Sequence, residues 1–91
     1  MNKTRRSELQ KQANALAELR TQLEDIKSEI EDVRDEEDDS YSNLPDGIQM
    51  SERGDIMQEC IDEMDEQIST LDDIISYLDD VTSGLQEVVD K

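Results

Sequence analysis

Two runs of apolar residues at heptad spacing, separated by one break, constrain this 91-residue chain more than any other feature. The a and d positions of the first run are Leu9, Gln12, Leu16, Leu19, Leu23, Ile26, Ile30 and Val33. Those of the second run are Met57, Ile61, Met64, Ile68, Leu71, Ile75, Leu78, Thr82, Leu85 and Val89. Apolar residues that alternate at spacings of three and four predict helices that pack along a narrow seam. The chain is therefore expected to be a coiled coil.

The break between the runs, residues 39–50, has the composition of a connection. Asn, Pro, Asp, Gly and Ser cluster there, and these residues favour turns over continued helix. We predict a first helix over about residues 4–38 and a second over about residues 52–90. Two helices of nearly equal length around one short connection favour antiparallel packing. The predicted fold class is all-α: residues 1–91 form one domain, a long antiparallel two-helix coiled-coil hairpin.

Charged residues beside the seam predict its register. In an antiparallel pair of helices the e positions of one helix face the e positions of the other. Arg20 is then expected to meet Asp72, and Lys27 is expected to meet Asp65. Exposed ion pairs stabilise a fold only slightly, so their main effect here is to select one alignment of the helices.

The net charge of −17 is concentrated in the second part of the chain. Residues 1–34 hold seven basic and seven acidic side chains, whereas residues 35–91 hold nineteen acidic and two basic ones. Such acidity repels phosphate and anionic lipid, so neither a nucleic acid nor a membrane is an expected partner. No run approaches the ~20 apolar residues that span a bilayer. We expect a protein partner, such as a basic nucleic-acid-binding protein.

The residue inventory is unfavourable for catalysis. The chain has no His and one Cys, which excludes nucleophile–base pairs of the Cys–His and Ser–His kinds. Carboxylates cluster around Asp62, Glu63 and Glu66, but the heptad places them at solvent-facing b, c and f positions, where a metal site is not expected. We predict no enzyme activity, no cofactor and no metal. Because Cys60 has no partner for an internal disulfide, a reducing cytoplasm is the expected compartment.

Two surfaces of the second helix are candidates for binding. The first is an acidic face, comprising Asp62, Glu63, Glu66, Asp73 and Asp80. The second is an apolar flank of g positions, comprising Ile74, Val81 and Val88, with Ala15 on the matching flank of the first helix. Because a two-helix hairpin buries little apolar surface, we expect this flank to join two hairpins into a homodimeric four-helix bundle. A target protein is the alternative occupant.

Each surface suggests a function. Carboxylates along a rigid helix can imitate the phosphates of a nucleic acid, which predicts an inhibitor that occupies the basic groove of a nucleic-acid-binding protein. The apolar flank instead predicts a structural or assembly module that oligomerises or docks on a larger complex. A third interpretation is that the acidity only keeps a small bundle soluble.

The segment Asn-Leu-Pro-Asp-Gly-Ile-Gln-Met-Ser-Glu-Arg-Gly, residues 43–54, adds a resemblance. Together with the apolar repeat that follows it, this segment resembles small acidic helical proteins encoded by phages and prophages of Gram-positive bacteria. The resemblance covers roughly residues 42–80, and its distinctive parts are Asn-Leu-Pro and Ser-Glu-Arg-Gly. It implies a bacterial host cell and favours an inhibitor of host defence, comparable to acidic helical anti-CRISPR proteins, but it implies no particular activity.

Overall fold

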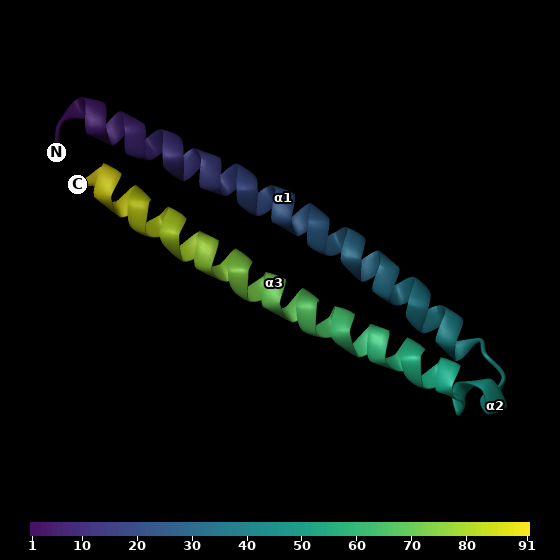
Figure 1. Cartoon of the computed structure of the whole chain (residues 1–91). Coiled ribbons are helices and arrows are strands. Elements are labelled where there is room, and N and C mark those ends of the chain that lie inside the picture. Colours follow the sequence, from purple (N-terminus) through teal and green to yellow (C-terminus); the bar gives the residue numbers. More distant parts are fainter. The chain divides into compact units, whose positions relative to one another are not determined.

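The computed structural model describes residues 1–91, and the chain is helical with no strand (Figure 1). Helix α1 spans Lys3–Ser42, the short helix α2 spans Asp46–Gln49, and helix α3 spans Glu52–Asp90. The predicted all-α fold class is confirmed. The structure places α3 at the predicted bounds, whereas α1 continues past its predicted end near residue 38. No Gly or Pro occurs before residue 45 to end α1 earlier.

Contacts divide the chain into two units. Unit 1 consists of Met1–Asp25 and Asp72–Lys91, and unit 2 consists of Ile26–Leu71. Each unit pairs a segment of α1 with a segment of α3, and within each unit the two segments run antiparallel, as predicted (Figure 1). Unit 1 holds both chain termini, and unit 2 holds α2 with the turns on either side of it.

The buried core is small in both units. In unit 1 the buried side chains are Ala13 and Ile75, which are 2% and 5% exposed. In unit 2 the buried side chain is Ile61, at 1% exposure, and Gly54, near the start of the same helix, is also buried. The other seam positions remain partly exposed, so much of the apolar surface stays in contact with water.

Helix α1 presents a different face to α3 from the one that the heptad predicted. The expected d positions Leu19, Ile26 and Val33 are 43%, 50% and 56% exposed. In contrast, Ala13 at an e position is buried, and the later e positions, which are basic, are partly buried. A small Ala allows close approach of the two helices, and long basic side chains can lie along a seam while their charged ends remain in water. The prediction that the d positions of α1 form the core was wrong.

The polar contacts of unit 1 also differ from the predicted register. Arg20 Nε donates to Asp79 Oδ1 at 2.7 Å, so the prediction that Arg20 pairs with Asp72 was wrong by one heptad. Gln10 and Gln86 exchange two hydrogen bonds between α1 and α3, with N–O distances of 3.0 and 2.9 Å. This reciprocal amide pair can be satisfied in only one alignment, so it helps to fix the register of unit 1.

In unit 2 the partner of Asp65 is Arg34. Arg34 Nε donates to Asp65 Oδ1 at 2.8 Å, whereas Lys27, the predicted partner, lies 3.4 Å from Glu31 on its own helix. The hydrogen bond to Asp65 is the largest of the effects that raise the pKa of the Arg34 guanidinium above its usual value. Arg34 therefore stays positively charged and links α1 to α3 within this unit.

The connection in unit 2 is closed by Gln49 and Gly54. The Gln49 side chain donates from Nε2 to the backbone oxygens of Tyr41 and Leu44, at 3.0 and 3.1 Å, and so satisfies carbonyls at and beyond the end of α1. Gly54, in the first turns of α3, lies against the backbone of Gln49. A methyl group at Gly54 would stand 2.6 Å from the Gln49 carbonyl carbon. Only glycine fits this approach.

Candidate functional site

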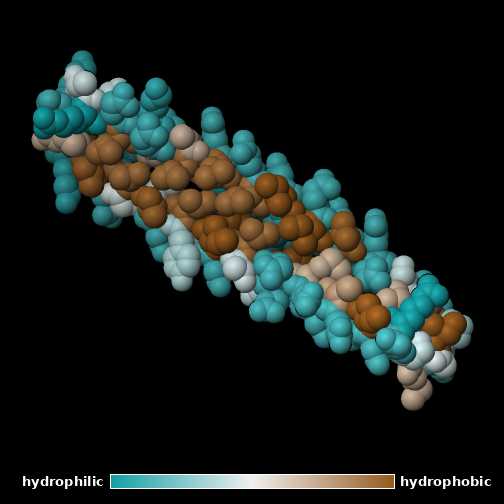
Figure 2. All heavy atoms as spheres, viewed as in Figure 1, coloured by the Kyte–Doolittle hydropathy of each residue, from teal (hydrophilic) through white to brown (hydrophobic).

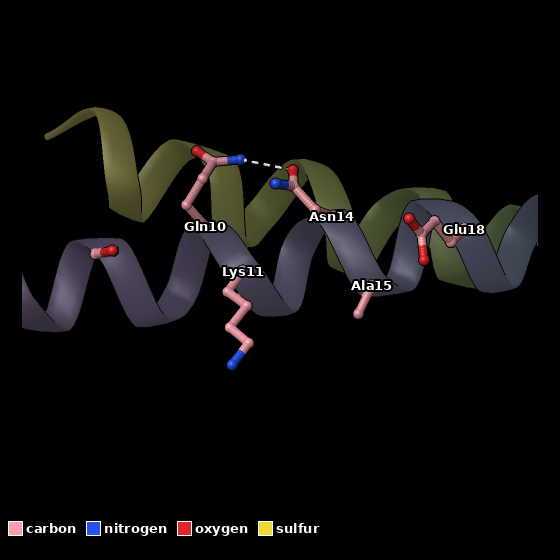
Figure 3. Close-up of a pocket in the computed structure, with 6 residues that line it drawn as sticks. Gln10, Lys11, Asn14, Ala15 and Glu18 are labelled. Carbon is pink, nitrogen blue, oxygen red and sulfur yellow. Dashed lines mark hydrogen bonds between the residues drawn. The ribbon is translucent and has the colours of Figure 1, made fainter.

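The surface hollows of the chain are shallow and are lined by short stretches of sequence. One lies on α1 and is shown in Figure 3, where Gln10 Nε2 donates to Asn14 Oδ1 at 3.0 Å. Its lining residues are Ser7, Gln10, Lys11, Asn14, Ala15 and Glu18. Two others lie beside Cys60 on α3 and beside Met1. Small-molecule sites usually enclose most of their ligand. Each of these hollows is formed without the facing helix.

Unit 2 carries most of the net charge. It holds sixteen acidic and three basic residues, a net charge of −13, whereas unit 1 holds ten acidic and six basic residues, a net charge of −4. Of the predicted acidic face, Asp62, Glu63 and Glu66 are exposed on the α3 segment of unit 2. Asp73 and Asp80 are also exposed but belong to unit 1. The structure therefore does not bring the five residues into one unit.

Helix α1 contributes to the acidic surface, which the sequence analysis missed. Eight of the sixteen acidic residues of unit 2 lie on α1, within residues 26–42. Five of them form the continuous run 35–39, which was counted in the charge of the chain but not assigned to a face. Arg34 contacts two members of this run, Asp35 at 3.3 Å and Asp38 at 3.7 Å, and leaves the rest without compensation from its guanidinium. No three Cys, Asp or Glu side chains are grouped so that they could hold a metal ion.

Unit 1 carries exposed apolar side chains on both of its helical segments. The predicted flank residues Ile74, Val81 and Val88 are 42%, 51% and 41% exposed, and Tyr77 on the same helix is 68% exposed. Leu19, displaced from the seam, adds α1 to this surface, because d positions of one helix and g positions of the other lie on one flank of an antiparallel pair. Figure 2 shows apolar atoms gathered over both helices of this unit. We call these five residues the apolar strip.

Ala15 and Gly84 are small residues near this strip. Ala15, the fourth predicted flank residue, is exposed, and Figure 3 shows it between the polar side chains of Lys11 and Glu18. Gly84 lies between Val81 and Val88 in the sequence of α3, and a methyl group added there would meet no atom within 4 Å. Ala15 lies one helical turn before Leu19 and therefore borders the strip, and Gly84 leaves open space beside it.

No family model, curated protein or solved structure matches this chain. No helix combines the length and the apolar composition needed to cross a membrane. The observations that bear on function are the acidic surface of unit 2 and the apolar strip of unit 1.

Proposed function

We propose that this chain is a non-enzymatic acidic binding protein, and that unit 2 occupies the basic surface of a nucleic-acid-binding protein. The observation that supports this function best is the net charge of −13 within residues 26–71. Both helical segments of the unit contribute carboxylates, so a partner can meet negative charge from two neighbouring helices. The proposed role is inhibition by occupation of the site that a nucleic acid would use.

The spacing of the carboxylates supports the comparison with a nucleic acid. The paired segments 26–42 and 52–71 hold eight and seven acidic residues. At a rise of 1.5 Å per residue the longer segment spans about 30 Å. The carboxylates of the two segments, counted together, amount to about one per 2 Å of this length. Duplex DNA presents one phosphate charge per ~1.7 Å. A groove that binds a duplex through Lys and Arg would therefore meet a similar density of negative charge.

The resemblance to phage and prophage proteins suggests which partner to look for. A phage-borne inhibitor of this kind acts in the cytoplasm of its bacterial host, on a host nucleic-acid-binding or defence protein. Association is expected to be fast and to weaken as salt screens the charges. The partner itself is to be identified by capture from a lysate of a Gram-positive bacterium.

Charge reversal in unit 2 is expected to reduce capture of the partner by tenfold or more. The test variant carries Asp62→Lys, Glu63→Lys and Glu66→Lys, and the matched control carries Asp73→Lys, Asp80→Lys and Glu87→Lys in unit 1. Both variants have the same net charge, so total charge does not distinguish them. They differ in that only the first removes negative charge from the proposed site. The control is expected to capture the partner at low salt. This capture should weaken as salt is raised from about 50 to 500 mM, and duplex DNA should compete with it. Equal capture by both variants would contradict the assignment to unit 2.

A second function is supported by the apolar strip. The chain would then be a structural or assembly module that oligomerises or docks on a larger complex, and the predicted homodimeric four-helix bundle is one such assembly. Half-exposed Ile and Val side chains on the α3 segment of unit 1, with Leu19 on its α1 segment, favour this function. Capture that persists at high salt and is lost in Val81→Asp would select it over the acidic mimic.

A further inference from the structure

We propose that the apolar strip of unit 1 is covered by the same strip of a second copy of this chain. The inference rests on the second proposed function, which is docking through the strip. It adds that the docking partner is a second copy of the chain. Two copies of unit 1 supply four helical segments, the number that closes a small bundle around one core. Unit 2 of each copy then remains available to a basic partner, so self-association and acidic binding use different parts of the chain.

The chain as a whole exposes more surface than a compact monomer of its mass. The chain exposes 6628 Å². A compact monomer of 10.5 kDa is expected to expose about 5,400 Å², so the excess is about 1,200 Å². Each partner in a stable protein–protein interface gives up about 800 Å². The surface that this chain exposes in excess is thus sufficient for one side of a stable dimer.

The charges favour unit 1 as the part that meets a second copy. Two units 2 would bring together two net charges of −13, whereas two units 1 bring together net charges of −4. Unit 1 also holds six basic residues, which can offset acidic side chains of the other copy across an interface. Repulsion between copies is therefore smallest where the apolar strip lies.

The composition of the strip fits a symmetric contact. In a two-fold dimer the same patch occurs on both sides, so each apolar residue must meet apolar residues of the other copy. Ile74, Val81 and Val88 recur at seven-residue spacing along α3, as an interhelical contact requires. Tyr77 supplies a large aromatic anchor, and the open space at Gly84 allows another helix to approach closely.

Sedimentation equilibrium of the full chain tests the proposal. The unmodified chain is expected at twice its 10.5 kDa mass at low micromolar concentration. Val81→Asp is expected to shift the equilibrium to the monomer by at least 100-fold, because it buries a charge in the interface. The matched control is Ile56→Asp in unit 2, because Ile56 and Val81 are 52% and 51% exposed. The control should remain a dimer. Leu19→Gln, on the other helix, should weaken the dimer about tenfold. This second variant tests the strip even if Val81→Asp fails to fold.

The outcomes separate this inference from the proposed functions. An unmodified chain that stays monomeric at about 100 µM would overturn the second copy as occupant, even if the chain still captures a partner. A dimer that Val81→Asp and Leu19→Gln both leave intact would overturn the strip as the interface. A dimer that dissociates in these variants but captures no basic partner would support the inference and count against the acidic-binding function alone.

Discussion

Gly54→Ala is expected to destabilise the chain by about 1–3 kcal/mol, because the new methyl group has no space. It would overlap the backbone oxygen of Gln49 and stand 2.6 Å from the carbonyl carbon of the same residue. The obstacle is backbone, so it cannot move aside by rotation of a side chain. Relief requires a shift of α2 away from α3, which would also disturb the hydrogen bonds from Gln49 to the end of α1.

Gly47→Ala, in the same connection, is the control for this prediction. No atom lies within 4 Å of a methyl group at Gly47, and its backbone has no positive φ angle. This variant is therefore expected to be neutral or more stable by up to about 1 kcal/mol, because Ala restricts the unfolded chain. Urea unfolding followed by circular dichroism measures both variants. Equal midpoints for Gly54→Ala and the unmodified chain would contradict the packing of α2 on α3.

Ile61→Ala is expected to destabilise the chain by about 2–5 kcal/mol, since it leaves a cavity at the most buried large side chain. Ile61 is 1% exposed, and few other side chains are buried enough to close around the space. For a small domain whose total stability is about 5–15 kcal/mol, this loss is a large fraction. Partial unfolding at ambient temperature is therefore an expected outcome.

Ile56→Ala provides the comparison on the same helix. Ile56 is 52% exposed, so the same removal of atoms is expected to change stability by less than about 1 kcal/mol. The difference between the two unfolding midpoints isolates burial from the loss of an Ile as such. Similar losses for both variants would show that α3 does not pack on α1 through the Ile61 face.

The sequence was sufficient to predict the helices but not their contact faces. The heptads and the Pro-Asp-Gly connection predicted both long helices and their antiparallel packing, and the bounds of α3 were close. The rotation of α1 was missed because Leu19, Ile26 and Val33 occupy apolar d positions that fit a two-helix seam equally well. Periodicity identifies an apolar stripe, but the centre of that stripe depends on the width of the partner's stripe and on small residues such as Ala13.

The candidate surfaces were predicted in part for similar reasons. Ile74, Val81 and Val88 were identified because their g positions extend beyond the seam, and they are exposed in the structure. Leu19 was not identified as a surface residue, because the same heptad assigned it to the core. The division of charge between the two units depends on which segments of α1 and α3 are paired in space. The antiparallel prediction implies this pairing, but the acidic run at residues 35–39 was counted only in the charge of the chain and was not assigned to a face.

One copy of this chain buries few side chains, and we propose that a second copy completes its core. The melting temperature of the unmodified chain, measured by circular dichroism between about 1 and 100 µM, tests this claim most directly. We predict a melting temperature that rises steadily with concentration, because mass action stabilises a folded state that is coupled to dimerisation. A melting temperature that is constant over this range would contradict it.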